Sequence, residues 1–321
     1  MKAHYLLLIS LLLTACGQSD TPPTETGKTR VRIALNWFPE AEHGGFYAAQ
    51  VHGYYAARNL EVEILGGGPD APVIQRVATG SVEFGVTNAD DVLYARAQQA
   101  PVVALMAPYQ TNPRCIMVHE AAGIEHIEQL AHITLAMSQR PAFSHYLRWK
   151  YPLTGVNIVP YPGNVSQFLA NPNFAQQGYV FSEPFVARQQ GGDPKALLVA
   201  DIGFNPYASV LIATEATVAQ RADITRAVVE ASIEGWTHYL RDAEQTNRHI
   251  NTLNPEMGLE ILAYGAKESR PLILDSVARE KGLGHMSAER WDTLLQQMTE
   301  ASLIEKTTAG AETAFDAQFL R

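Results

Sequence analysis

The chain has 321 residues, of which 46% are hydrophobic and 18% charged, a composition typical of a folded globular protein rather than a disordered one. Its formal net charge of −9 gives no electrostatic support for nucleic-acid binding, which disfavours that class of partner. Beyond the N-terminal apolar run, no segment approaches the roughly 20 apolar residues that a membrane-spanning helix needs.

The N-terminus has the order of a secretory signal. Met1-Lys2 precedes a largely apolar run from Tyr5 to Leu13, which is too short to span a bilayer. Leu-Thr-Ala directly before Cys16 resembles the bacterial lipobox, in which the cysteine is acylated and becomes the first mature residue. We therefore expect a lipoprotein signal peptide at 1–15 and a membrane anchor on Cys16. The alternative is an ordinary signal peptide whose cysteine is accidental.

The segment after the signal has the composition of a tether. Residues 17–29 contain no large apolar side chain, so 16–30 is expected to be a lipidated, flexible linker. If Cys16 carries lipid, Cys115 has no disulfide partner. Because Cys115 begins an apolar stretch that runs to Val118, we expect it to be a small buried side chain rather than a reactive thiol.

From Val31 onward, short apolar strands alternate with segments of helical spacing. The expected strands are 31–35, 62–64, 82–86 and 102–106, and the expected helices are 43–58, 73–78 and 90–98. This rhythm, with loops of a few residues, predicts a parallel, doubly wound α/β sheet.

The same rhythm restarts after Pro113. Strands are expected at 133–137, 156–159, 179–181, 196–199 and 210–213, with helices near 142–150 and 165–169. Helices then dominate, at 224–240, 255–266 and 288–301, with Asp223 and Ser287 as expected caps. The chain is therefore expected to cross between two lobes near 108–114 and 203–211. We expect lobe 1 to comprise 31–112 and 208–321, with C-terminal helices, and lobe 2 to comprise 113–207.

Polar and aromatic side chains follow nearly every predicted strand. Ligands of open α/β sheets bind beyond the carboxyl ends of the strands, so these segments predict a recognition cleft. The segments are Asn36-Trp37-Phe38-Pro39, Gly66-Gly67-Gly68-Pro69-Asp70, Thr87-Asn88-Ala89-Asp90, Ser138-Gln139, Tyr161-Pro162-Gly163-Asn164 and Ser182-Glu183-Pro184.

The candidates of the first segments each have two interpretations. Trp37 is more typical of a ligand platform than of a surface anchor, and His43 either faces the ligand or begins a helix. Tyr47 lies one turn beyond His43 and suits core packing as well as stacking. Asn88 or Asp90 suits a helix cap better than a ligand contact, although both stay candidates.

The later candidates are similarly balanced. Glu183 suits the first turn of a helix, where an acid complements the helix dipole, and it is equally well placed to meet a cation or an amidine. Tyr207, in Asn205-Pro206-Tyr207, falls at the second expected crossing, where a hinge and a ligand contact could coincide.

Enzyme and metal motifs have little support in the sequence. Gly66-Gly67-Gly68 lacks the Gly-Lys-Ser/Thr ending of a phosphate loop and is expected to be a turn. The ten histidines show no His-Glu-x-x-His spacing, and Gly-x-Ser-x-Gly is absent. We therefore expect no metal site, no cofactor and no catalytic residues.

The segment Asn36-Trp37-Phe38-Pro39-Glu40-Ala41-Glu42-His43-Gly44-Gly45-Phe46-Tyr47 resembles the opening motif of a known family. This is the thiamine-pyrimidine-precursor branch of periplasmic solute-binding proteins, whose relatives also bind riboflavin, sulfonates or nitrate. The similarity continues at 53–55, 59–62 and 80–85 and extends from residue 31 to about 300.

The resemblance implies a type II periplasmic binding protein fold, in which two doubly wound, mostly parallel lobes close on a small ligand. It also implies delivery of that ligand to the permease and ATPase subunits of an ABC importer. Asn36, Trp37, His43 and Tyr47 would face the cleft from one lobe, with Glu183 and Tyr207 opposite.

A eukaryotic enzyme of the same superfamily makes the thiamine pyrimidine from its own active-site histidine, using pyridoxal phosphate bound to a lysine. Both residues follow the third strand there, whereas Val86-Thr87-Asn88-Ala89-Asp90-Asp91 contains neither. We therefore expect a monomeric, extracytoplasmic, lipid-anchored binder of a thiamine pyrimidine precursor of the aminopyrimidine type. Riboflavin or another small aromatic or sulfonate is the alternative ligand, and a biosynthetic enzyme is the alternative class.

Overall fold

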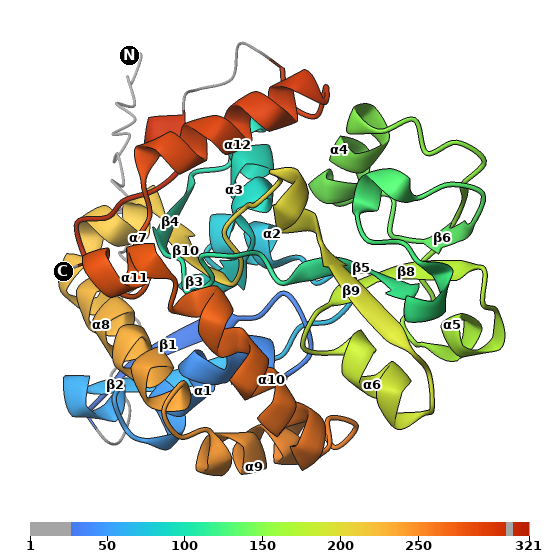
Figure 1. The fold of residues 1–321 in the computed structure, drawn as a ribbon. Coiled ribbons are helices and arrows are strands. Elements are labelled where there is room, and N and C mark those ends of the chain that lie inside the picture. Colours follow the sequence, from blue (N-terminus) through green and yellow to red (C-terminus); the bar gives the residue numbers. More distant parts are fainter. Residues whose placement is uncertain (1–26, 306–310, 321) are drawn as a thin grey trace, which may run out of the picture.

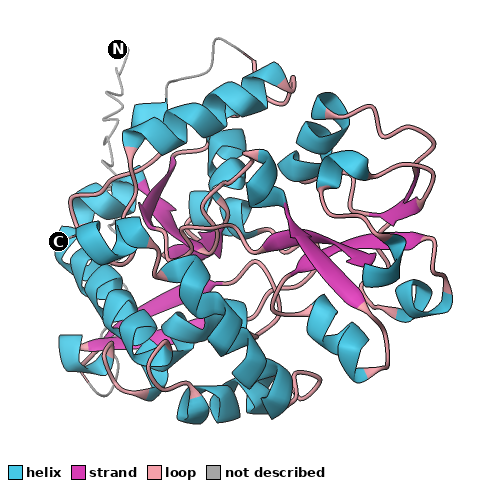
Figure 2. Cartoon of the chain, viewed as in Figure 1, coloured by secondary structure: helices cyan, strands magenta, loops and turns pink. Residues whose placement is uncertain are grey.

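The structure is a computed structural model that describes residues 27–305 and 311–320. The expected signal peptide, the lipidation of Cys16 and most of the expected tether lie outside the described residues. Two five-stranded sheets flanked by helices make up the fold, and they lie side by side in Figures 1 and 2. We refer to each sheet with its covering helices as a lobe.

The first sheet has the strand order β2-β1-β3-β10-β4. β1 pairs in parallel with β2 and β3, whereas β10 runs antiparallel to β3 and β4. The strands are β1 (Thr29–Ala34), β2 (Leu60–Leu65), β3 (Phe84–Thr87), β4 (Val102–Met106) and β10 (Val210–Thr214). The helices between its first four strands are α1 (Gly44–Val51), α2 (Val73–Ala78) and α3 (Ala89–Ala97).

The second sheet repeats this plan with the order β7-β6-β8-β5-β9. β6 is parallel to β7 and β8, and β5 is antiparallel to β8 and β9. The elements are β5 (Arg114–His119), β6 (Thr134–Ala136), α4 (Ala142–Lys150), β7 (Asn157–Val159), α5 (Ser166–Ala170), β8 (Phe174–Tyr179), α6 (Glu183–Gln189) and β9 (Pro194–Leu198). The predicted two-lobe α/β architecture is confirmed, with one antiparallel strand in each sheet.

Helices follow the last strand, as the sequence predicted. They are α7 (Glu215–Gln220), α8 (Ala222–Tyr239), α9 (Glu244–Leu253), α10 (Leu259–Ile273), α11 (Ser276–Lys281) and α12 (Ala288–Glu300). Short 3₁₀ turns complete the described elements: η1 (Ala41–His43), η2 (Ala56–Arg58), η3 (Glu120–Ala122), η4 (Ile127–Gln129), η5 (Val199–Ile202) and η6 (Ala311–Thr313). Among the described residues, no helix is both long and apolar enough to cross a membrane.

Several predicted boundaries differ from the structure. Strand β5 was not predicted, because its apolar residues 115–118 form a continuous run without the alternation that marks a half-buried strand. β8 ends at Tyr179 instead of beginning there, since Gln176 and Gln177 interrupt its apolar pattern. The helix expected to reach Arg58 ends at Val51, before Gly53 with its φ of +76°.

The two expected helix caps have different outcomes. The Ser287 hydroxyl accepts a hydrogen bond from the Arg290 N–H at 3.4 Å, which confirms it as the cap of α12. The prediction for Asp223 was wrong, because α8 begins one residue earlier, at Ala222, and Asp223 lies inside its first turn. A carboxylate in the first turn interacts favourably with the helix dipole but does not cap the N-terminus of the helix.

The two segments that cross between the sheets are hydrogen-bonded to each other. The backbone N–H of Asn112 donates to Asn205 Oδ1 at 2.8 Å, and Asn112 Nδ2 donates to the carbonyl of Pro206 at 2.9 Å. Tyr109 and Ala208 form an antiparallel bridge beside these bonds. The crossings therefore act as one paired connection between the lobes.

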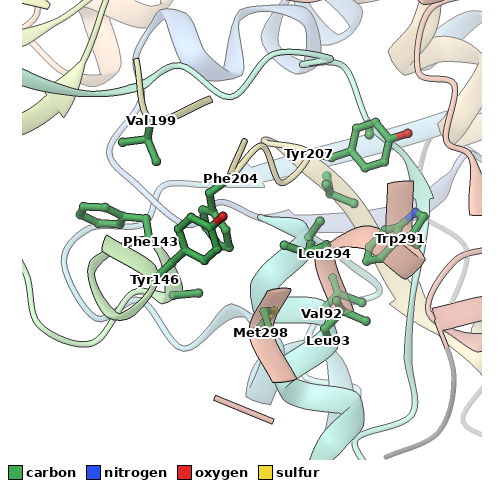
Figure 3. Packing of buried hydrophobic residues seen from close by; sticks show 14 of the residues in the cluster. Val92, Leu93, Phe143, Tyr146, Val199, Phe204, Tyr207, Trp291, Leu294 and Met298 are labelled. Atoms are coloured by element: carbon green, nitrogen blue, oxygen red, sulfur yellow. The ribbon is translucent and has the colours of Figure 1, made fainter. Parts of the chain in front are cut away.

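An apolar cluster extends from the first lobe into the second beside this connection. In Figure 3, Val92 and Leu93 of α3 pack near Leu294 of α12, and Phe204 lies between these helices and α4. The rings of Phe204 and Tyr146 stack with centroids 4.6 Å apart. On this side the lobes therefore share one core.

Helices α1 and α8 pack so closely at Gly45 and Gly235 that a side chain at either position would overlap the other helix. A Cβ atom on Gly45 would lie 2.0 Å from the Trp236 ring, and one on Gly235 would lie 2.2 Å from the Gly45 carbonyl oxygen. Only glycine fits such contacts. The packing fixes the position of α1, and with it the β1–α1 loop that contributes to the site described below.

We predict that Gly45→Ala destabilises the protein by about 1–3 kcal/mol, despite the better helix propensity of alanine, because the Trp236 ring has to move. Thermal unfolding followed by circular dichroism measures this. The control is Gly258→Ala, where the added methyl group meets no atom within 4 Å and φ is −59°. Equal shifts in the two variants would contradict the close-packing argument.

Candidate functional site

Titratable side chains from both lobes gather between the two sheets. We call this group the interlobe cluster, and it consists of Glu40, Glu42, Asp90, Asp91, Arg114, Tyr161, Tyr179 and Glu183. Electrostatic coupling joins its two sides, since Arg114 on β5 acts on Glu42 and Asp90 of the first lobe. The cluster contains five carboxyl groups and one guanidinium.

The β1–α1 loop supplies a buried acid and a neutral histidine. Glu42 is 2% exposed, and its Oε1 accepts a hydrogen bond from the Ser209 hydroxyl at 3.1 Å. Burial raises the pKa of Glu42 to about 7, although Ser209 and Arg114 oppose the shift. Burial also lowers the pKa of His43 to about 3, so this imidazole stays neutral while its Nε2 lies 2.9 Å from Asn36 Oδ1.

Two neighbouring acids at the start of α3, Asp91 and Asp90, differ in their hydrogen bonds. Asn88 occupies the N-cap position, and Asp91 Oδ2 accepts from the Thr87 hydroxyl at 2.7 Å and from the Asn88 N–H at 3.4 Å. Asp90 is 8% exposed, and its Oδ1 has no hydrogen-bond partner among the described residues. Burial, with Asp91 adding to it, raises the pKa of Asp90 to about 7.

The second lobe contributes a carboxylate that is already hydrogen-bonded. Glu183 is the first residue of α6, as its helix-start interpretation predicted. Its Oε1 accepts from the Tyr161 hydroxyl, and its Oε2 accepts from the Tyr179 backbone N–H at 2.7 Å. A Cβ atom on Gly178 would lie 2.7 Å from Glu183 Oε2, so glycine permits this approach. Glu183 therefore orients Tyr161 within its own lobe.

Sequence reasoning missed Arg114 as a site residue, as it did Glu40, Glu42, Asp91 and Tyr179, and Arg114 is the one cation of the interlobe cluster. Its guanidinium lies over the rings of Phe143 and Tyr179, 4.5 and 4.9 Å from their centroids. The neighbouring carboxylates and Tyr179 raise its pKa even though burial opposes the charged form. The available signal was a cation at the first position after Pro113, directly before an apolar run, where an unrecognised strand begins.

The β1–α1 loop carries an aromatic pair, in which Trp37 is half-buried and Phe38 is exposed. Trp37 and Phe38 meet edge to face with ring centroids 5.4 Å apart, and Phe38 is 46% exposed. Residues 66–68, which were expected to be a turn, form a loop that leads into a turn at 69–70, and this loop supports the pair because the Gly67 N–H donates to the Trp37 carbonyl at 2.8 Å. A Cβ atom on Gly67 would lie 2.1 Å from the Leu35 carbonyl oxygen.

Two predicted site residues pack among helices instead. Tyr47 is 1% exposed, and its ring meets that of His249 on α9 at 5.9 Å. Tyr207 lies under the Arg290 guanidinium at 3.8 Å and beside Trp291, and its hydroxyl accepts from the Ser287 N–H (Figure 3). Among the predicted residues, Asn36 contacts His43, and Asp90 and Glu183 both act electrostatically on Arg114, while these two tyrosines support the helical layer.

Two surface hollows lie outside the interlobe cluster. One of about 530 Å³ is bounded by α7, the start of α8 and the C-terminal segment, and one of about 250 Å³ lies between residues 203–205 and α12. Neither is lined by a residue of the cluster. Within the described part of the chain, no group of three or more His, Cys, Asp or Glu side chains could hold a metal ion.

Residues 40–246 match the model of the family described as NMT1/THI5 like. The chain therefore belongs to this family. It is 26% identical to the riboflavin-binding protein RibY of Chloroflexus aurantiacus, over 98% of this chain and 96% of that protein. It is 23% identical to the formylaminopyrimidine-binding protein of Halalkalibacterium halodurans, over 98% and 97% of the two chains.

Two further similarities concern an enzyme and a solved structure. A 4-amino-5-hydroxymethyl-2-methylpyrimidine phosphate synthase of Legionella pneumophila is 26% identical over only 32% of this chain and 33% of that enzyme. The periplasmic aliphatic sulphonate binding protein SsuA of Escherichia coli superposes with a TM-score of 0.69 at 15% identity, over 89% of this chain and 91% of that one. This superposition confirms the periplasmic binding protein fold.

The raised pKa of Glu42 generates a pH prediction. Between about pH 4.5 and 7 the folded protein holds a proton on Glu42 that the unfolded chain releases, so stability falls as pH rises through this window. Glu42→Gln keeps an acceptor for Ser209 but cannot ionise. We expect its unfolding free energy to rise relative to wild type, by on the order of 2 kcal/mol, between about pH 5 and 8.

Chemical denaturation of both proteins across this pH range measures the difference, and the exposed acid Glu256, replaced by Gln, is the control. The buried histidine His43 also makes stability depend on pH, but it is present in both proteins and cancels in the comparison. A constant difference between wild type and Glu42→Gln across the range would contradict the buried, protonated state of Glu42.

Proposed function

We propose that this protein is the substrate-binding subunit of an ABC importer and holds a small, flat nitrogen heterocycle between its two lobes. The interlobe cluster carries this proposal, because groups of both lobes are coupled across it. The family membership supports it, as do two relatives that match nearly the whole chain and are named as binding proteins.

The charge of the cluster favours a ligand that donates hydrogen bonds. The cluster holds five carboxyl groups and one guanidinium, so it offers many hydrogen-bond acceptors and only one cation to an anionic sulfonate. An aminopyrimidine-type thiamine precursor supplies N–H donors and a flat ring, and it is the leading ligand. Riboflavin, which is larger but also flat and also carries an N–H donor, is the second candidate.

Each site residue has a proposed role that follows from its contacts. Trp37 stacks on the ring of the ligand, and Asn36, oriented by neutral His43, offers its amide. Asp90 accepts from the ligand, while Asp91 holds the start of α3 through the Thr87 hydroxyl and the Asn88 N–H. In the second lobe, Glu183 orients Tyr161 toward the same space. Tyr47 and Tyr207 act indirectly, by fixing α1 and the second crossing.

Binding is favoured over catalysis. The synthase relative matches a third of the chain, whereas the two binding proteins match nearly all of it. The segment after β3 is occupied by the Asn88 and Asp91 groups that begin α3, and it offers neither a lysine nor a histidine. Incubation with the heterocycles should return them unchanged, and turnover would instead favour an enzyme.

We further propose an extracytoplasmic, monomeric protein that is tethered to a membrane through lipid on Cys16 and delivers its ligand to a permease and its ATPase. The tethering rests on the lipobox-like sequence before Cys16. The delivery rests on the two-lobe fold, in which closure around a ligand presents a distinct surface to a partner.

Binding to an aminopyrimidine and to riboflavin tests the function by isothermal titration calorimetry. We expect wild type to bind at least one of them with micromolar or tighter affinity. Trp37→Ala should weaken the binding of every flat ligand by about 1–3 kcal/mol, because stacking is insensitive to ring identity. Glu183→Gln should discriminate between ligands, because it disturbs one polar contact through Tyr161.

Trp149→Ala is the matched control, since Trp149 is 49% exposed on α4 of the second lobe. It should leave affinity unchanged. Failure of wild type to bind any flat heterocycle would overturn the proposed function. Unchanged affinity in Trp37→Ala would contradict the stacking role of Trp37 but not the proposed function.

The anchor is tested by Cys16→Ser. Without the thiol no acyl chain can be attached, so the protein should leave the membrane fraction and collect in the soluble or unprocessed pool. Fractionation of cells followed by immunoblotting measures this. Recovery of the variant on membranes with a mature N-terminus and unchanged detergent partitioning would contradict lipidation.

A further inference from the structure

Arg114 has donors that the protein itself does not use. Its side chain makes one hydrogen bond, a long one of 3.4 Å to the Tyr179 hydroxyl. Throughout residues 27–305 and 311–320, no carboxylate oxygen lies within 4.0 Å of its nitrogens. The contacts with Phe143 and Tyr179 engage the face of the guanidinium, whereas its N–H groups point along its plane.

In the other lobe, Asp90 has a hydrogen-bond acceptor that receives no donor. It is buried in the first turn of α3, and its Oδ1 lacks a hydrogen-bond partner among the described residues. The contacts that begin the helix go to Asp91 instead. A buried carboxylate oxygen without a donor is costly, so Asp90 and Arg114 each lack what a ligand can supply.

These two residues attract each other across the lobes without touching. Asp90 and Arg114 are electrostatically coupled, yet they form no ion pair in the described chain. Arg114 is positioned by the amide of Asn112, whose Oδ1 accepts from its backbone N–H at 3.0 Å, and Asn112 belongs to the paired crossings. Arg114 is therefore placed by the connection that joins the two lobes.

We propose, building on the proposed function, that Arg114 and Asp90 together read one edge of the ligand. Arg114 donates to an acceptor on that edge, and Asp90 accepts from the N–H group beside it. The recognised class is a neutral or protonated ring with an adjacent donor and acceptor, such as the amino group and ring nitrogen of an aminopyrimidine or the imide of a flavin.

This pairing also accounts for what the site rejects. A sulfonate offers acceptors to Arg114 but no donor, so Asp90 Oδ1 would stay without a hydrogen-bond partner. Lysine could not replace Arg114, because its ammonium lacks the planar fork that meets an acceptor while stacked on aromatic rings. Arg114 therefore supplies the contact to the ligand's acceptor from the second lobe, and Asp90 supplies the discrimination between ligands with and without the adjacent donor.

Matched probes separate the two contacts. The pairs are 4-amino-5-hydroxymethyl-2-methylpyrimidine with its analogue lacking the amino group, and riboflavin with N3-methylriboflavin. Each analogue keeps the acceptors and loses the donor. Dissociation constants are measured by calorimetry for wild type, Asp90→Ala, Arg114→Lys and the control Arg148→Lys, which lies on the exposed side of α4.

We expect Asp90→Ala to weaken binding of the parent compound by about tenfold to a hundredfold and to change binding of its analogue little. The variant should therefore lose most of the discrimination between the two compounds. Arg114→Lys should weaken parent and analogue alike, since both keep the acceptor, and Arg148→Lys should change neither. If Asp90→Ala does not fold, Asp90→Asn, which keeps the shape, should reduce discrimination in the same direction.

Two results would overturn this inference while leaving the proposed function intact. One is wild-type discrimination preserved in the folded Asp90 variants, and the other is wild-type affinity in Arg114→Lys, which would reduce Arg114 to a source of charge. If wild type binds neither parent compound, the proposed function itself fails and the edge-reading role fails with it.

Discussion

The hydrogen-bonded pairing of the two crossing segments is the constraint on which the rest of the structure depends. Asn112 bonds both Asn205 and Pro206, so the chain passes between the lobes twice at one place. The strand that follows each crossing, β5 or β10, enters its sheet antiparallel between two others. Side chains at the strand ends of both sheets are consequently brought toward one region, where the interlobe cluster forms.

The cluster concentrates negative charge where the protein supplies few cations. Burial raises the pKa of Glu42 and of Asp90 to about 7, so the ligand-free protein keeps part of this charge neutralised by protons. In the proposed complex, a ligand that brings N–H donors would replace those protons, and closure of the lobes around it would strengthen each contact by excluding water.

Helical packing outside the cluster has a supporting role. The glycine contacts between α1 and α8 fix the position of α1 against α8. The loop from Asn36 to His43 leads directly into α1. At the opposite end of the lobe, Tyr207 is held between Arg290 and Trp291, close to the second crossing. Residues such as Tyr47 and Tyr207 therefore shape the site without belonging to the interlobe cluster.

The sequence by itself determined the alternation of strands and helices, the two-lobe class and the loops in which polar residues gather, because hydrophobic periodicity and turn residues act locally. It indicated Asn36, Trp37, Asp90 and Glu183 through their places after predicted strands, and His43 through the motif that leads into the first helix. Only the tertiary structure decided that Arg114 joins them, that Asp91 rather than Asp90 holds the start of α3, and that Tyr47 and Tyr207 turn toward helices. Each of those outcomes depends on which surface a distant segment presents, and local pattern carries no information about that.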